Sequence, residues 1–434
     1  MMRYKLFGAS GLRVSELFLG AMTFGEQGGV GAPLPECRRI LDAYADAGGN
    51  VIDTAINYRG GASEEILGEL LEGRRDRFVL ATKYTVSRDR EDPNAAGNHR
   101  KNLRLSLETS LRRLRTDYLD IYWVHMWDRH TPAEETMRAL DDQVRAGKIL
   151  YVGISDSPAW LAAQANTLAA WHGWTAFTGL QVPYNLLRRD IERELLPMAE
   201  TLGMTVAAWS PLADGILSGK FTAADPAEQG TRVDPANLSD QQRAVATTLA
   251  EVARELGATP AQVAIAWTMA RSPAIHPIVG ARRLPQLLDN LAAADLELPA
   301  EVVRRLDAAT EPDLGFPTTF IRDTGPWVFG AAAVNLSAQT KAAYCRSSAL
   351  AAPVRQLSAI DSDMGSGKMS SSSFSTPSRM ARATDSGVAF GMSKPRVMSV
   401  STGPVSTACT RTPRPASRAR SDWVIENAAA LEIA

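Results

Sequence analysis

The chain has 434 residues and a formal net charge of -1, so its charge gives no reason to expect nucleic acid or a membrane surface as a partner. Its three cysteines are too few for a disulfide framework and suit a reducing compartment. No apolar stretch reaches the roughly 18–20 residues that span a bilayer, and the N-terminus MMRYKLFGAS lacks the apolar core of a signal peptide. We therefore expect a cytoplasmic protein, and the oligomeric state stays open.

Eight apolar runs are typical of buried β-strands, because they are rich in β-branched and aromatic residues. Helical patterns separate most of them, as in PECRRILDAYADAG, where Ile40, Leu41 and Tyr44 share one face and Gly48 follows the helix. The same spacing occurs in NHRKNLRLSLETSLRRL, ERELLPMAETLG and RAVATTLAEVARELG. About eight such alternations favour a closed parallel (β/α)8 TIM barrel over an open sheet. The eight runs are LFLGAM, NVIDTA, RFVLATK, LDIYWVH, ILYVGIS, GLQVPYN, TVAAWSP and HPIVGA.

The composition changes near residue 335. The segment 336–434 is rich in serine, carries more basic than acidic residues and lacks a long apolar periodicity. Such a segment cannot bury enough apolar surface to offset its ordering entropy, so we expect a barrel over residues 1–330 and a disordered tail over 336–434. A small appended domain, or docking of the last stretch DWVIENAAALEI, is the alternative. One hypothesis is that this tail is a read-through or frame-shifted extension.

Four polar residues stand in or close behind three of these runs. Asp53 and Tyr58 lie in NVIDTAINY, Lys83 ends RFVLATK, and His125 ends LDIYWVH. In a parallel barrel the C-terminal ends of the strands meet at the mouth, where such enzymes place their chemistry. An acid, a phenol, an amine and an imidazole meeting there suggest a proton-donating site. Each alone has an ordinary explanation, as a cap, a turn aromatic, a solvated amine or a core histidine, but together they favour catalysis.

Longer segments resemble the aldo-keto reductase family. The similar runs include GNVIDTAINYRGGASEEILGELL, SLRRLRTDYLDIYWVH, GLQVPYNLL, AAWSPLADGILSGK and PIVGARRLPQLLDNLAA, and the resemblance fades past GFPTTF. Several independent motifs occur in the family's order and spacing. The resemblance implies a (β/α)8 fold, an NADPH cofactor (in some members NADH) and reduction of an aldehyde or ketone to an alcohol.

Carbonyl reduction by a bound cofactor requires the protein to supply a proton and to stabilise the developing alkoxide. Tyr58 is the predicted donor, although a phenol has an ordinary pKa near 10. We expect the Lys83 ammonium to lower that pKa and Asp53 to hold Lys83 charged and oriented. His125 is expected to donate to the substrate carbonyl. The resemblance implies the same four roles at these four positions.

The later strands are expected to hold the cofactor. Asp156 stands where the family usually has Asn, and a carboxylate cannot supply the amide donor. The run SPLADGILSGK can wrap a pyrophosphate with its backbone N–H groups, and the fork of Arg282 suits a 2′-phosphate. The cofactor contacts that the resemblance implies are Ser155, Asp156, Gln181, Trp209, Ser210, Leu212, Gly215, Lys220, Gly280, Arg282, Gln286 and Asn290.

Other functions have weaker support. The five histidines form no HxH, HExxH or Cys/His cluster, so we predict no metal site. A regulatory subunit that binds NADPH and acts through a partner, like the potassium-channel β-subunits built on this barrel, is one rival. An inactive gene product is another, if the tail records a frameshift. Aromatic side chains in loops expected over the mouth suggest an aromatic or aliphatic carbonyl substrate; they are Phe24, Trp127, Phe316 and Phe320.

Overall fold

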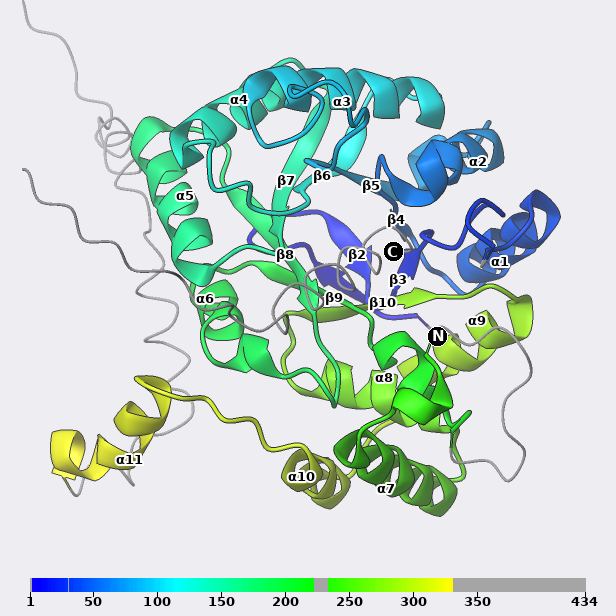
Figure 1. Cartoon of the computed structure of the whole chain (residues 1–434), viewed down its shortest axis with the longest axis vertical. Coiled ribbons are helices and arrows are strands. Elements are labelled where there is room, and N and C mark those ends of the chain that lie inside the picture. Colours follow the sequence, from blue (N-terminus) through cyan, green and yellow to red (C-terminus); the bar gives the residue numbers. More distant parts are fainter. Residues whose placement is uncertain (1, 30, 222–232, 331–434) are drawn as a thin grey trace, which may run out of the picture. The chain divides into compact units, whose positions relative to one another are not determined.

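A computed structural model describes residues 2–29, 31–221 and 233–330. Eight parallel strands form a closed barrel, in which each strand pairs with the next along the chain and the last strand pairs with the first (Figure 1). Each of the eight runs expected to be a strand overlaps one of these strands, which confirms the predicted (β/α)8 class. The barrel strands are β3 (Phe18–Gly20), β4 (Val51–Asp53), β5 (Val79–Tyr84), β6 (Leu119–Val124), β7 (Ile149–Ser155), β8 (Phe177–Pro183), β9 (Thr205–Trp209) and β10 (Ile275–Gly280).

Helices surround the barrel, and the four helical patterns singled out in the sequence fall on α1, α3, α6 and α7. Most connect one strand to the next, so strand residues are covered on both faces and read as continuous apolar runs. The helices are α1 (Leu34–Asp46), α2 (Ala62–Leu70), α3 (Arg100–Leu114), α4 (Ala133–Arg145), α5 (Ala159–His172), α6 (Leu195–Thr201), α7 (Asp240–Leu256), α8 (Pro260–Ala270), α9 (Leu284–Ala292), α10 (Ala300–Ala309) and α11 (Thr318–Phe329).

Helix α1 shows how the apolar stripe and one polar atom fix a helix on the barrel. Its residues Ile40, Leu41 and Tyr44 are fully buried, as the spacing predicts. The Tyr44 hydroxyl donates to the Leu17 carbonyl (2.8 Å) and accepts from the Val51 amide (3.1 Å). Because these groups adjoin β3 and begin β4, the buried phenol satisfies backbone atoms that the short strands leave open.

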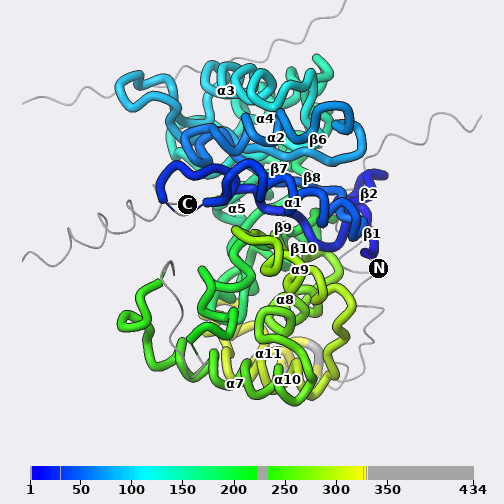
Figure 2. The backbone as a smooth tube through the Cα atoms, turned by 90° about the vertical axis from the view of Figure 1, so that its right-hand side faces the viewer, coloured from blue at the N-terminus to red at the C-terminus, as the bar shows by residue number. Residues whose placement is uncertain are grey.

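A hairpin of β1 (Tyr4–Leu6) and β2 (Arg13–Ser15), which the sequence pattern did not predict, closes one end of the barrel. The Gly8 amide donates to Thr205 Oγ1 (2.7 Å), and Thr205 is the first residue of β9, so the hairpin covers the N-terminal ends of the strands. Figure 2 shows it beside the N-terminus of the chain. The hairpin thus leaves the opposite end, where the strands finish, as the end at which parallel barrels place their functional residues.

Aliphatic side chains and a few aromatic rings fill the barrel interior. Phe7, between β1 and β2, packs edge-on against the fully buried Trp123 of β6, with ring centroids 6.3 Å apart. Two strand glycines make room: a Cβ on Gly153 would lie 2.3 Å from the Trp123 ring, and one on Gly179 would lie 2.8 Å from it. Such contacts exclude any side chain at either position, which explains glycine in the middle of β7 and β8.

The expected tail, residues 336–434, lies outside the described residues, so the boundary near residue 335 stays a prediction. The described chain ends with α10 and α11, which follow the last barrel strand. Within the described ranges, no helix is both long and apolar enough to cross a membrane.

Candidate active site

Lys83 is the centre of the polar group at the C-terminal ends of the strands. Its ammonium is fully buried and donates to Asp53 Oδ2 (2.5 Å), to the Thr54 carbonyl (2.9 Å) and to the Tyr58 hydroxyl (3.0 Å). These three acceptors match the three donors of an ammonium. The structure thus brings together Asp53 from β4, Lys83 from β5 and Tyr58 from the loop between them.

A tight turn directs Tyr58 back over the mouth. The turn that Tyr58 begins has three successive left-handed residues, Arg59 (φ 54°), Gly60 (φ 63°) and Gly61 (φ 101°). Two of the three are glycines, which adopt this conformation without steric cost. The Ile56 amide donates to the Lys83 carbonyl (3.2 Å), so the loop is also tied to β5 by its backbone.

His125 follows β6 and completes the group. Its ring lies edge-on to Tyr58, with centroids 6.1 Å apart. In the described part of the chain, its buried Nδ1 has no hydrogen-bond partner. Burial and the nearby Lys83 charge lower the pKa of His125 to about 3. The imidazole is therefore neutral at physiological pH, with one ring N–H that can donate to a ligand.

The titration behaviour of Tyr58 differs from the sequence argument. Burial raises the pKa of the phenol, and the Lys83 charge lowers it by a smaller amount, so the net direction is upward. The sequence indicates the neighbouring ammonium, but the desolvation of the phenol depends on how the folded chain packs around it. Burial also lowers the pKa of Lys83, but Asp53 and Tyr58 raise it by more. At neutral pH the site thus holds a protonated phenol beside a charged ammonium.

Gln181, at the end of β8, contacts this group directly. Its Nε2 donates to Asp53 Oδ1 (2.9 Å), while the other Asp53 oxygen accepts from Lys83. The contact leaves the side-chain carbonyl of Gln181 as an acceptor. Ser155, expected to contact the cofactor beside Gln181, is buried at the end of the neighbouring β7.

Asp156 and Trp209 are partners across the mouth. The Trp209 Nε1 donates to Asp156 Oδ1 (3.2 Å). Asp156 has an exposed surface, but protein atoms around the carboxyl desolvate it and raise its pKa to about 6. Arg188 lies over the Trp209 ring, 5.9 Å from its centroid. An acid with this pKa donates a hydrogen bond when protonated, which a carboxylate cannot do.

The loop after β9 contains three successive left-handed residues, Ala213 (φ 47°), Asp214 (φ 56°) and Gly215 (φ 97°). Turns of this kind can gather backbone N–H groups into concavities that bind anions. In this structure the three amides donate within the loop: Ala213 to the Ser210 carbonyl (3.0 Å), Asp214 to the Ser210 hydroxyl (3.2 Å) and Gly215 to the Leu212 carbonyl (2.9 Å). Asn185 supports the loop, because its Nδ2 donates to the Ser210 carbonyl (2.8 Å). Leu212 and Lys220, also expected to contact the cofactor, belong to the same loop.

The segment after β10 carries the remaining expected contacts. Gly280 is exposed at the strand end, and the Arg282 amide donates to Gln286 Oε1 (3.1 Å). Asn290, expected to face the adenine with Gln286, is buried and donates through Nδ2 to the Gly280 carbonyl (3.3 Å). The side-chain amide of Asn290 therefore donates to the end of β10, whereas that of Gln286 accepts from the Arg282 backbone.

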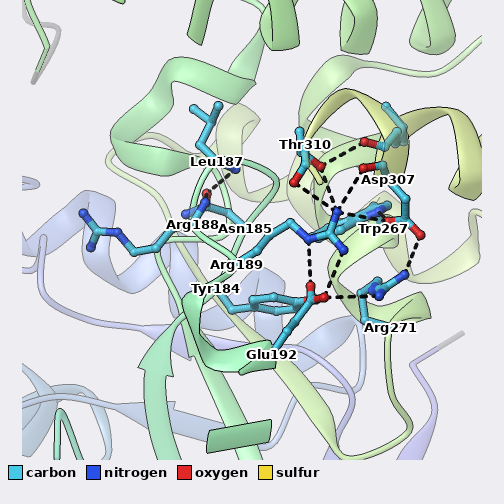
Figure 3. A network of polar contacts seen from close by, with 11 residues as sticks. Tyr184, Asn185, Leu187, Arg188, Arg189, Glu192, Trp267, Arg271, Asp307 and Thr310 are labelled. Carbon is cyan, nitrogen blue, oxygen red and sulfur yellow. Dashed lines mark hydrogen bonds and ion pairs between the residues drawn. The ribbon is translucent and has the colours of Figure 1, made fainter. Parts of the chain in front are cut away.

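A buried network that the sequence reasoning missed supports the loop after β8 (Figure 3). Arg189 binds both oxygens of Glu192 (2.8 and 2.9 Å) and also donates to Thr310 Oγ1 (3.0 Å). The Tyr184 hydroxyl donates to Glu192 (2.6 Å). Thr310 directly follows α10, so the network joins the β8 loop to the end of that helix. The spacing of Arg189 and Glu192, three residues apart in RRDIE, was the only sequence signal.

No group of three or more His, Cys, Asp or Glu side chains could hold a metal ion among the residues the structure describes. The polar group at the mouth instead consists of an acid, an ammonium, a phenol and a neutral imidazole.

Comparison with known proteins assigns the class. The family model described as the aldo/keto reductase family matches residues 16–311. Norsolorinic acid reductase from Aspergillus flavus is 39% identical over 74% of this chain and 84% of its own length. Norsolorinic acid reductase stcV from Emericella nidulans is 41% identical over 72% of this chain and 82% of its own length. Aryl-alcohol dehydrogenase [NADP(+)] from Phanerodontia chrysosporium is 36% identical over 72% of this chain and 87% of its own length. The chain belongs to the aldo/keto reductase family.

Proposed function

We propose that this protein reduces an aldehyde or ketone to an alcohol with NADPH, and that Tyr58 donates the proton. The observation that carries the proposal is the buried Lys83 ammonium, which binds Asp53 and Tyr58 at once. Membership of the family supports carbonyl reduction. A relative named aryl-alcohol dehydrogenase [NADP(+)] supports the choice of cofactor.

The four side chains have distinct roles in this proposal. The Tyr58 phenol is protonated at neutral pH and gives its proton to the carbonyl oxygen. The Lys83 charge stabilises the phenolate left behind, and Asp53 keeps Lys83 oriented. Neutral His125 donates a hydrogen bond to the carbonyl oxygen and orients it. Because the groups are already in contact, little reorganisation accompanies the reaction.

The residues around the later strands fit a nicotinamide dinucleotide. The amides of the left-handed run after β9 are assigned to a pyrophosphate, for which they exchange their hydrogen bonds within the loop, and Arg282 supplies a cation for a 2′-phosphate. When bound, the cofactor supplies the hydride. We propose that the nicotinamide end contacts Ser155, Asp156, Gln181 and Trp209. The phosphate and adenine ends are assigned to Ser210, Leu212, Gly215, Lys220, Gly280, Arg282, Gln286 and Asn290.

We further propose an aromatic carbonyl as substrate. Trp127 follows His125 by two residues, and its ring meets that of Trp160 edge-on with centroids 5.4 Å apart. Trp160 is 56% exposed, so this aromatic pair presents apolar surface beside the mouth. Aromatic rings favour stacked or edge-on contact with other rings. A relative named aryl-alcohol dehydrogenase [NADP(+)] supports the same class.

The test is oxidation of NADPH, followed by absorbance, with an aromatic aldehyde and an aliphatic aldehyde of matched size. We expect steady turnover with both and a higher kcat/KM for the aromatic one. Trp160→Ala should reduce that preference, because the exposed ring is lost. Tight NADPH binding without turnover on any aldehyde, ketone or quinone would favour the regulatory-subunit alternative.

A further inference from the structure

A buried carboxylate lies behind the polar group, on the helical side of β5. Glu64, on α2, has no exposed surface, and it accepts a hydrogen bond from Thr82 Oγ1 (2.7 Å). Thr82 directly precedes Lys83, but its side chain points to the opposite face of the strand. A fully buried acid is costly unless it is paired. Its cationic partner is Arg113 of α3, whose Nη1 lies 3.3 Å from Glu64 Oε2.

Arg113 also reaches the loop that carries Tyr58. The same Nη1 donates to the Ile56 carbonyl (2.9 Å), two residues before Tyr58. The guanidinium packs against the turn after Tyr58 as well, because a Cβ added to Gly61 would lie 2.4 Å from the Arg113 Cζ. Arg113 thus contacts the loop on both sides of Tyr58. Figure 1 shows α2 and α3 side by side outside β4 and β5.

The start of α2 is fixed by a second buried hydroxyl. Ser63 Oγ lies 2.8 Å from Thr54 Oγ1 and 2.7 Å from the Ala21 carbonyl, to which it donates. Thr54 is the residue whose carbonyl accepts from Lys83. The N-terminal turn of α2 therefore contacts the residues after β3, the residue after β4 and, through Glu64, β5. A shift of α2 would move the supports of both Tyr58 and Lys83.

We propose that Glu64 and Arg113 form a positioning pair that holds the Tyr58 loop against Lys83, so that the phenol lies where it can give its proton. The inference rests on the proposed function. Neither side chain belongs to the group around Lys83: Glu64 acts through Thr82 and Arg113, and Arg113 acts through the Ile56 carbonyl and Gly61. Loss of the pair should slow the proton-coupled step and leave cofactor affinity unchanged.

The test is a single-turnover measurement of NADPH oxidation with an aldehyde, because product release can hide the chemical step in steady state. Arg113→Ala should slow it by about tenfold or more, since small misplacements of reacting groups are costly. Its Kd for NADPH should match that of the wild type. Added guanidinium ion should restore part of the rate in Arg113→Ala and none in Tyr58→Phe. Arg112→Ala, an exposed neighbour on α3, is the matched control and should behave as wild type.

Arg113→Ala leaves Glu64 buried without its cation and could unfold the chain, so the double variant Glu64→Gln/Arg113→Met is measured beside it. The neutral amide still accepts from Thr82, and this variant should fold but react slowly, because the Ile56 carbonyl has lost its donor. A wild-type single-turnover rate in the folded double variant overturns the inference. So does a slow Arg113→Ala that guanidinium does not restore. An inactive wild-type protein refutes the proposed function itself, which distinguishes the two failures.

Discussion

The two halves of the mouth differ in what their polar side chains bind. At the ends of β4 and β5, Asp53, Lys83 and Tyr58 bind one another through short contacts that converge on one ammonium. At the ends of β7 to β10, the side chains expected to meet the cofactor bind other parts of the protein instead. Trp209 donates to Asp156, and Asn290 donates to the Gly280 carbonyl.

The polar groups at the ends of β4 and β5 are therefore already assembled, whereas those at the ends of β7 to β10 would have to change hydrogen-bond partners to bind a ligand. Preorganised dipoles and charges act on a reaction without reorganising, so the first half should control the rate. In the proposed function the second half exchanges internal hydrogen bonds for bonds to a dinucleotide, so it should control affinity. Gln181 belongs to both halves, since it donates to Asp53 and retains a carbonyl acceptor. Substitutions in each half should therefore give different kinetic signatures.

The largest effect in this series is expected from Lys83→Met. Turnover should fall by well over tenfold, because the phenolate loses its counter-charge. Since Lys83 opposes the upward shift of the Tyr58 pKa, its removal should move the alkaline limb of the pH–rate profile to higher pH. The double variant Asp53→Asn/Lys83→Met, which leaves no unpaired buried carboxylate, controls for misfolding. Full activity with an unchanged profile would remove Lys83 from the mechanism.

Arg282→Ala tests the half of the mouth that is expected to control cofactor affinity. The binding free energy of NADPH should weaken by on the order of 1.5–3 kcal/mol, the contribution of a charge-assisted phosphate contact, and the Kd should rise accordingly. The Kd for NADH should change little, because only NADPH carries the 2′-phosphate. Arg283→Ala removes the same charge from the neighbouring position and serves as the control. Equal weakening of both cofactors by Arg282→Ala would show that this residue does not read the phosphate.

A smaller, pH-dependent effect is expected from Asp156. With a pKa of about 6, its carboxyl donates to a ligand below that pH and only accepts above it. NADPH should therefore bind the wild type more tightly as the pH falls through about 6, relative to Asp156→Asn, whose amide donates at every pH. Comparing the two proteins cancels the titration of the cofactor's own phosphate. Parallel Kd–pH curves would show that Asp156 does not contact the nicotinamide end.

The smallest effect is expected from removal of residues 336–434. Every strand that the structure describes and every residue of the proposed site precedes residue 330, so turnover and the main unfolding transition should match those of the full chain. Limited proteolysis of the full chain should cut first between residues 335 and 420, at Lys and Arg. A truncated protein that unfolds, or that loses most of its turnover, would show that the tail is part of the folded structure.

The sequence predicted the barrel well because its strands are continuous apolar runs of the right length. It also predicted which polar residues would meet, since Asp53, Lys83 and His125 stand at strand ends that a parallel barrel must bring together. The hairpin β1–β2 escaped because its strands, YKL and RVS, are short and mix polar with apolar residues, whereas the equally short β3 and β4 are fully buried and lie in apolar runs.

Contacts between distant side chains could not be predicted in the same way. Gln181 binds Asp53 across 128 residues of sequence, and Glu64 binds Arg113 across 49. A hydrophobic pattern gives the face on which a residue lies but not the atoms that its side chain reaches. The direction of the Tyr58 pKa was missed for a related reason, because desolvation depends on every element packed around the phenol.

Whether Tyr58 is the proton donor of a preassembled group is decided by Tyr58→Phe, measured in single turnover with NADPH and an aldehyde. Removing a positioned acid should slow hydride transfer by at least about a hundredfold. The Kd for NADPH should stay at the wild-type value, because the phenol acts in the transition state and not in cofactor binding. Hydride transfer at the wild-type rate in this variant would exclude Tyr58 as the proton donor.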